Sequence, residues 1–174
     1  MDQSAKIVVN MLGKEEVGQT KLLYTLNKPW EEKLFLGIDF CSKDIIVNQK
    51  VYKVQVWRNN SSNYWVKKYS ENKPDIIFCL IFDITNRDSF TYINEVADTI
   101  NKNTNNLIYL LGNKADLESQ RDVSIEEAES FANNHNMKYY EVSAKTKQPN
   151  SLEEVLTIAL ENMSGVKEEL KVED

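Results

Sequence analysis

Short apolar runs alternate along this chain with segments in which apolar residues recur every three or four positions. The runs are rich in β-branched and aromatic residues, and they lie at residues 7–9, 51–57, 76–82, 107–111 and 138–142. The segments with helical spacing lie at residues 20–26, 89–100, 124–132 and 151–160. Near-continuous apolar strands that alternate with helices predict an α/β fold, in which helices cover both faces of a parallel sheet.

Two regions depart from this alternation. Phe40 and the stretch Ile45–Val51 can pair as an antiparallel hairpin at the sheet edge, turned at Asn48 and Gln49. After Gly165 the chain is acidic, and we expect a frayed helix or a disordered tail there. The predicted organisation is therefore one domain at residues 1–165 and a flexible acidic tail at residues 166–174.

Composition narrows the classes of function. The chain has 174 residues, 21 Lys and Arg against 27 Asp and Glu, and a formal net charge of −6, which argues against nucleic-acid binding. No apolar run approaches the length of a membrane span. Two cysteines cannot form a disulfide framework, and the first residues lack the layout of a secretory signal peptide. We therefore expect a cytoplasmic protein.

The segment after the first apolar run has the frame of a phosphate-binding loop, G-x-x-x-x-G-K-S/T. It stands between a predicted strand and a predicted helix, where backbone amides and the helix N-terminus can face a phosphate. The hydroxyl at its last position is a candidate ligand for Mg²⁺. The residues of the frame that we assign to phosphate are Gly13, Glu15, Glu16, Val17, Gly18, Gln19 and Thr20, of which Thr20 carries the hydroxyl.

Three side chains in this loop oppose phosphate binding. Gln19 is a neutral amide where the frame has lysine, so the positive charge on the outer phosphates is missing. Glu15 and Glu16 add two carboxylates. If they point inward, each like-charge pair about 5 Å apart costs roughly 3 kcal/mol at an effective dielectric of about 20. The alternative interpretation is a strand-to-helix turn that binds nothing.

Two further loops follow predicted strands and carry groups that suit guanine. The first contains Asn113, Lys114 and Asp116, and the second contains Ser143, Ala144 and Lys145. The carboxylate of Asp116 can accept hydrogen bonds from N1–H and the 2-amino group of guanine, which adenine does not offer. The amide of Ala144 can donate to guanine O6. Each stretch alone would be an ordinary loop, but their order and their places after strands together indicate a guanine site.

Over residues 6–163 the chain resembles small GTPases of the Ras superfamily, in particular the Rab branch. Residues 36–40 (LGIDF) resemble the Rab signature I-G-V-D-F, and residues 80–90 (LIFDITNRDSF) resemble the stretch around Y-D-V-T-N-R-E-S-F. The resemblance implies a P-loop G domain with a mostly parallel six-stranded sheet, one antiparallel edge strand and about five flanking helices. It also implies GDP or GTP with Mg²⁺ as cofactors, and protein effectors or regulators as partners in vesicle traffic.

The chain departs from this family where phosphate, metal and hydrolysis are handled. Arg58 stands at the position of the Asp that holds a water of the metal shell, and Phe35 stands near the position of the switch-I Thr. Ser61 and Ser62 replace the Gly that meets the γ-phosphate and the Gln that orients the attacking water. Because phosphoryl transfer depends on positioning and electrostatics, we do not expect efficient GTP hydrolysis.

Three functions remain open. The chain is a pseudo-GTPase that binds guanine nucleotide weakly or without Mg²⁺ and acts through protein contacts, or a slow but active GTPase, or an interaction module without nucleotide. Arg58 either substitutes for the missing metal charge or is a solvated surface group. A candidate partner patch, with core packing as the alternative, comprises Phe40, Trp57, Trp65 and Tyr69. The tail has no cysteine, so no lipid anchor is expected unless the chain is a trimmed fragment.

Overall fold

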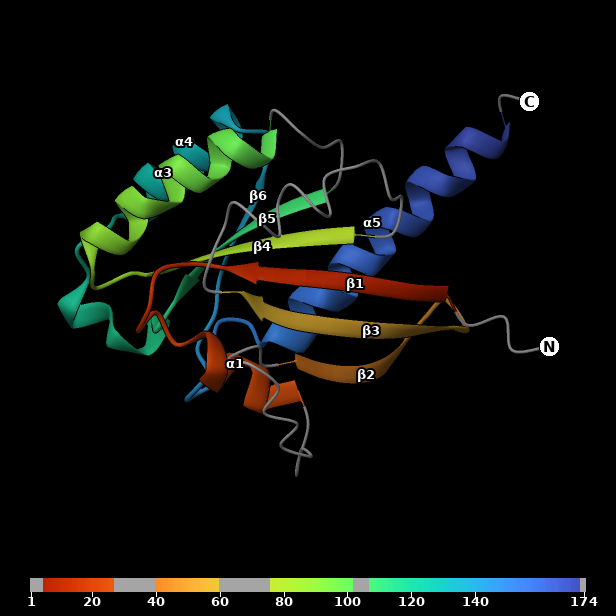
Figure 1. Cartoon of the computed structure of the whole chain (residues 1–174), viewed down its shortest axis with the longest axis horizontal. Helices are drawn as coiled ribbons and strands as arrows, with labels where there is room; N and C mark the ends of the chain where they lie inside the picture. Colours follow the sequence, from red (N-terminus) through yellow and green to blue (C-terminus); the bar gives the residue numbers. More distant parts are fainter. Residues whose placement is uncertain (1–4, 27–39, 60–75, 102–106, 173–174) are drawn as a thin grey trace.

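The computed structural model describes residues 5–26, 40–59, 76–101 and 107–172, which form a six-stranded sheet with helices on both faces (Figure 1). The strands are β1 (Ala5–Leu12), β2 (Phe40–Val47), β3 (Lys50–Asn59), β4 (Ile76–Asp83), β5 (Leu107–Asn113) and β6 (Lys138–Glu141). The helices are α1 (Gln19–Leu26), α3 (Arg87–Asn101), α4 (Ile125–Asn134) and α5 (Leu152–Val172), with a 3₁₀ helix at Ala115–Gln120.

The sheet has the predicted mixture of directions. Its strand order is β2-β3-β1-β4-β5-β6, and only the edge pair β2–β3 is antiparallel among the described strands. Asn48 and Gln49 have φ values of 49° and 63° and connect Val47 to its partner Lys50. Positive φ at two adjacent residues is the geometry of a two-residue hairpin turn. The mostly parallel sheet with one antiparallel edge strand is confirmed.

Helices cover both faces of the sheet, as the apolar runs predict. All eight residues of β4 are buried, because this strand lies in the middle of the sheet with side chains packed on both sides. Leucines of α1 and apolar residues of α5 form one core cluster with the sheet. Apolar residues of α3 and α4 form a second cluster on the other face. The runs in β1, β4 and β5 therefore contribute to both cores, which is why their apolar residues are nearly continuous, whereas β3 contributes buried residues to the first cluster alone and alternates with polar ones.

Helix α5 is longer than the sequence pattern predicts. The apolar spacing ends near residue 160, whereas the helix continues through Gly165 to Val172. Its first turn is fixed by reciprocal bonds, since the Glu154 amide donates to Ser151 Oγ and the Ser151 amide donates to Glu154 Oε2. Residue 165 is therefore not a helix end, and the flexibility of the tail stays a prediction. None of the described helices is both long and apolar enough to span a membrane.

The carboxyl ends of four neighbouring strands meet at one edge of the sheet (Figure 1). The register pairs Leu12 at the end of β1 with Asn59 at the end of β3, and Asp83 at the end of β4 with Asn113 at the end of β5. The loops that leave these strands therefore lie next to one another. In open α/β sheets this edge is where ligands bind.

Two isoleucines give a matched test of the core. Ile77 in β4 is fully buried, whereas Ile46 in the edge strand β2 is 69% exposed. Ile77→Ala is expected to lower the free energy of unfolding by about 2–5 kcal/mol, because it removes buried apolar atoms and leaves a cavity. Ile46→Ala is expected to change it by about 0.5 kcal/mol or less. Urea denaturation of both variants measures this, and equal losses would contradict the described packing.

Candidate functional site

The loop between β1 and α1 surrounds a cavity of about 360 Å³, here called the loop cavity. Its two glycines have no space for a side chain. A Cβ on Gly13 would lie 2.4 Å from the carbonyl oxygen of Ile81, and a Cβ on Gly18 would lie 2.6 Å from Nδ2 of Asn113. Gly18 also has a φ of 91°, and Glu16 has a φ of 67°. Local packing therefore requires both glycines of the predicted frame.

Gln19 lines the loop cavity from the first position of α1. The residue is only 4% exposed, and a Cβ on Gly13 would lie 3.0 Å from its Nε2 atom. Among the described residues, no acceptor takes a hydrogen bond from this Nε2. A buried donor without a partner costs about 1–3 kcal/mol. The described residues alone therefore leave this buried donor without a hydrogen bond.

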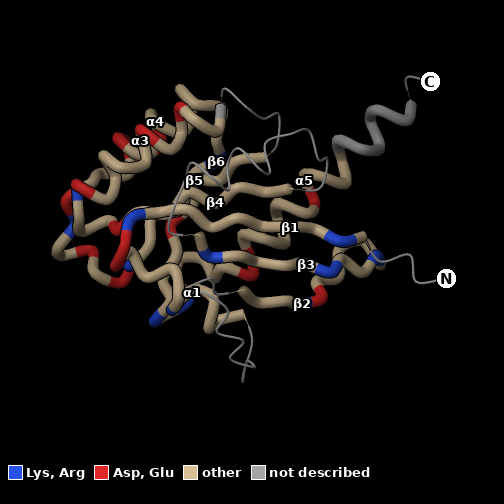
Figure 2. Tube along the Cα trace, in the orientation of Figure 1, with Lys and Arg blue, Asp and Glu red and all other residues tan. Residues whose placement is uncertain are grey.

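Charges of both signs line the loop cavity, and Figure 2 shows basic and acidic positions following one another in the loop after β1. The lining residues with charged side chains are Lys14, Glu15, Glu16, Lys21, Arg58 and Lys114, and Thr20 adds a hydroxyl. Glu15 and Glu16 are exposed, so solvent screens the repulsion that the sequence predicts. Four cationic side chains therefore face two screened carboxylates.

Arg58 reaches the loop cavity from the neighbouring strand. It lies near the end of β3, where the register pairs it with Met11 of β1, and it is half-buried. Arg58 is therefore partly exposed, and its interpretation as a solvated surface group stays a prediction. Whether it substitutes for a metal charge is a separate question, because the lining position alone does not identify a ligand.

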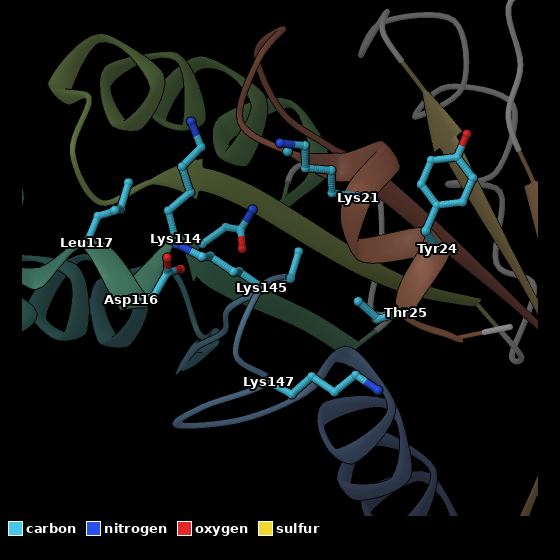
Figure 3. A pocket seen from close by; sticks show the side chains of 11 residues that line it. Lys21, Tyr24, Thr25, Lys114, Asp116, Leu117, Lys145 and Lys147 are labelled. Carbon is cyan, nitrogen blue, oxygen red and sulfur yellow. The ribbon is translucent and has the colours of Figure 1, made fainter. Parts of the chain in front are cut away.

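A second cavity of about 660 Å³, here called the large cavity, lies between α1, the end of β5 and the loop after β6 (Figure 3). Five of the six residues assigned to guanine line it: Asn113, Lys114, Asp116, Ala144 and Lys145. The sixth, Ser143, is buried beside it. Gly18, Lys21 and Lys114 line both the large cavity and the loop cavity, and Asn113 contacts the phosphate loop. The two cavities therefore adjoin.

Ser143 holds the Asp116 carboxylate in place. Its hydroxyl donates to Asp116 Oδ1 at 2.6 Å and accepts from the backbone amides of Lys145 and Thr146, both at 3.1 Å. The same side chain therefore orients the carboxylate and shapes the loop after β6. An ionised carboxylate has about four lone-pair sites, so Asp116 keeps acceptor capacity toward the large cavity.

Asn113 joins the end of β5 to the phosphate loop. Its Nδ2 donates to the carbonyl oxygen of Val17 at 2.7 Å, and its buried Oδ1 has no hydrogen-bond partner among the described residues. The next residue, Lys114, has a φ of 65° and places its Nζ 2.5 Å from Oδ2 of Asp83. The end of β4 therefore fixes the Lys114 side chain, which lines both cavities.

Sequence reasoning missed the wall of the large cavity that α1 provides. Lys21, Tyr24 and Thr25 line it, and Leu117 and Lys147 complete the lining from other elements (Figure 3). Positions i, i+3 and i+4 of a helix share one face, so the spacing of the three α1 residues could have indicated a second, polar face opposite the buried leucines.

Part of the candidate partner patch is present in the described structure. Phe40 and Trp57 occupy paired positions on β2 and β3, and their rings stack with centroids 4.8 Å apart. Both residues remain half-buried. Trp65 and Tyr69 lie outside the described residues, as do Phe35, Ser61 and Ser62. The extent of the patch and the roles at those five positions therefore stay predictions.

Arg58 opposes a Mg²⁺ ion at Thr20, but the carboxylates of Glu15 and Glu16 line the same cavity, so the assignment of Thr20 to Mg²⁺ stays a prediction. Mg²⁺ takes oxygen ligands, usually with one or two carboxylates from the protein. Arg58 lines the cavity that Thr20 lines, and a guanidinium repels a metal cation. Within residues 5–26, 40–59, 76–101 and 107–172, no three His, Cys, Asp or Glu side chains form a group that could hold a metal ion.

The described residues do fit a guanine nucleotide. The large cavity offers the oriented Asp116 carboxylate, and it is also lined by Asn113, whose buried Oδ1 has no hydrogen-bond partner among the described residues. The adjoining loop cavity offers the unused Gln19 donor and four cationic side chains. The donor edge of a base would match the acceptors of the large cavity. A phosphate chain, which is rich in acceptors, would match the cations of the loop cavity.

Comparisons with known proteins agree with this geometry. Residues 6–164 match the family model described as the Ras family. The chain is also 32% identical over 142 residues to a protein of Dictyostelium discoideum named Ras-related protein Rab-2B. That alignment covers 78% of this chain and 70% of the relative.

Asn113→Ala tests the connection between the two cavities. The substitution removes the donor to the buried Val17 carbonyl and leaves that acceptor unsatisfied. The free energy of unfolding is expected to fall by about 1–3 kcal/mol. Asn94→Ala is the matched control, because Asn94 is exposed on α3 and alanine favours a helix. Urea denaturation compares the two, and an Asn113 variant as stable as the control would contradict the connecting role.

Proposed function

This chain belongs to the Ras family of small GTPases, and from that membership we propose that it is a Rab-like pseudo-GTPase. In this proposal it binds guanine nucleotide without needing Mg²⁺ and acts through protein contacts. Members of the Ras family bind GDP and GTP with Mg²⁺. The observation that carries the proposal is the loop cavity, in which Arg58 and the uncharged Gln19 line the place where the family resemblance implies a metal-site Asp and a lysine.

Base recognition rests on groups that the fold holds rigidly. The Asp116 carboxylate, oriented by Ser143, accepts from N1–H and the 2-amino group of guanine, and the Ala144 amide donates to O6. Adenine presents an acceptor at N1 and no 2-amino group, so the carboxylate would lose both hydrogen bonds. Hydrogen bonds to a charged group contribute about 1.5–3 kcal/mol each. The site is therefore proposed to select guanine over adenine strongly.

Phosphate binding in this proposal uses donors that belong to the protein. Gln19 supplies a neutral N–H group from inside the loop, and Arg58 supplies positive charge from β3. A guanidinium presents several N–H groups in a plane and pairs well with phosphate oxygens. Because Arg58 and the lysines of the loop cavity belong to the chain, the phosphate chain does not need a metal ion to balance its charge.

Efficient hydrolysis does not follow from this arrangement. Phosphoryl transfer depends on charge placed around the transferred group and on an oriented nucleophile. The sequence has no Gln at the water-orienting position, where Ser62 stands, and no Asp at position 58. Without these groups the transition state loses several stabilising interactions. A slow but active GTPase is the alternative that a hydrolysis assay would have to support.

The proposal extends to partners and place of action. Rab-like proteins act on protein effectors or regulators, and we propose that the stacked pair Phe40 and Trp57 belongs to such a contact in vesicle-traffic regulation. The pair is half-buried on the antiparallel edge of the sheet, beside the loops of the site. We also propose a cytoplasmic location, a reducing compartment in which the buried Cys41 and Cys79 would stay outside any disulfide.

The first test is a calorimetric titration of nucleotide-stripped protein with GDP, GTP and ADP, in Mg²⁺ and in EDTA. The expected result is binding of GDP and GTP but not ADP, with the same affinity in both buffers. Tight binding that requires Mg²⁺ would overturn the proposal in favour of a slow GTPase. No binding of any nucleotide would leave an interaction module that uses the G-domain scaffold.

A second test restores the two charges that the resemblance implies. The double variant Gln19→Lys with Arg58→Asp places a cation in the loop and a carboxylate beside Thr20. Affinity for GTP in Mg²⁺ is expected to rise by roughly tenfold or more over the affinity in EDTA. The single variant Gln19→Lys is the control, since it adds the cation without a metal partner. If the double variant gains no Mg²⁺ dependence, the two positions do not explain the difference from the family.

A further inference from the structure

Lys21 stands where the two cavities of the site meet. It lines both the loop cavity and the large cavity, as do Gly18 and Lys114. Figure 3 shows the side chain of Lys21 extending from α1 toward the side of the large cavity where Lys114 lies. The side chain of Lys147 extends away from Lys114. A ligand with one part in each cavity would pass this point.

The helix geometry separates Lys21 from Gln19. Residues two apart on an α-helix point in directions about 200° apart around the axis. Gln19 is accordingly buried within the loop, whereas Lys21 is exposed at the rim. Lys21 cannot fill the position of a lysine at residue 19, but a flexible four-carbon stem allows its ammonium group to reach the cleft from outside.

The charge of Lys21 is not used elsewhere in the described protein. Within the described residues no carboxylate forms an ion pair with its ammonium group, whereas Lys114 is paired with Asp83. The neighbouring Gln19 is only 4% exposed, and its Nε2 independently lacks a hydrogen-bond acceptor among the described residues. The Lys21 ammonium group and the nearby Gln19 Nε2 are therefore two donors without an acceptor among the described residues.

We propose that Lys21 binds the phosphate chain of the nucleotide where the chain leaves the ribose, and that it supplies the positive charge that Gln19 lacks. This inference rests on the proposed function and concerns the same site. The ligand chemistry is a guanosine 5′-phosphate, with the ammonium group on the phosphates nearest the ribose. Lys21 lines the large cavity as well as the loop cavity, whereas Gln19 and Arg58 line the loop cavity alone, so the phosphates nearest the ribose fall to Lys21.

The test is calorimetry on the nucleotide-stripped full chain with guanosine and GDP as probes, in EDTA. Lys21→Ala is expected to weaken GDP binding roughly tenfold and to leave guanosine binding unchanged, because guanosine has no phosphate. Lys21→Arg is expected to keep most of the GDP affinity. Lys6→Ala is the matched control, since it removes the same charge from an exposed position near the opposite end of β1 and should change neither affinity.

The outcomes separate this inference from the proposed function. If wild-type protein binds GDP and Lys21→Ala binds it equally well, the inference is overturned and the proposed function stands. An equal loss of guanosine and GDP binding in Lys21→Ala would also overturn it, because the effect would not come from phosphate. If the wild-type protein binds neither guanosine nor GDP, both the proposed function and the inference about Lys21 are overturned.

A double-mutant cycle gives a second, independent measurement. If Lys21 compensates for position 19, then Gln19→Lys should reduce the effect of Lys21→Ala on GDP affinity, since the new lysine supplies the same charge. Equal effects of Lys21→Ala in both backgrounds would show that the two positions act separately, and would contradict the compensating role.

Discussion

The site depends on one close approach, between the end of β5 and the loop after β1. Nδ2 of Asn113 donates to the Val17 carbonyl at 2.7 Å, and the absence of a side chain at Gly18 allows Asn113 to come this near. The parallel pairing of β1 and β5 with β4 between them sets the distance that this bond bridges. The two cavities therefore have a fixed relation to each other, and neither could shift without breaking a buried hydrogen bond.

Charge is arranged around this fixed frame in an unusual way. The residue inside the loop, Gln19, is neutral and buried, and the cations stand outside it on three different elements. Arg58 comes from β3, Lys21 from α1 and Lys114 from the end of β5. A cation buried inside the loop would carry a desolvation cost that the neutral Gln19 avoids, and of the three cations Lys21 is exposed while Lys114 is paired with Asp83. The arrangement suits a protein that is stable without its ligand.

Much of the fold could be predicted from the sequence because its signals are local. Apolar runs that serve two cores identified the parallel strands, and Asn48-Gln49 identified the antiparallel turn. The meeting of Asn113, Asp116 and Ala144 at one cavity was predictable as well, since they lie at or after the ends of strands that must meet, and their role toward guanine stays a prediction. The roles of Lys21 and Tyr24 were not predictable, because a polar helical face is ordinarily solvated and only the tertiary structure places it against a cavity. The end of α5 was left open between a frayed helix and a disordered tail, because its apolar spacing ends before the helix does.

The steric demand at Gly13 and Gly18 has a consequence for how protein sequences are compared. A side chain at either position would collide with the backbone of β4 or with Asn113, whatever the loop binds. The two glycines therefore reflect how a strand, a loop and a helix pack. A domain could lose every phosphate contact and still need both glycines for this packing. A motif search that counts these glycines recognises an architecture. Only the residues between and beyond them, such as those at positions 19, 21 and 58, carry information about chemistry.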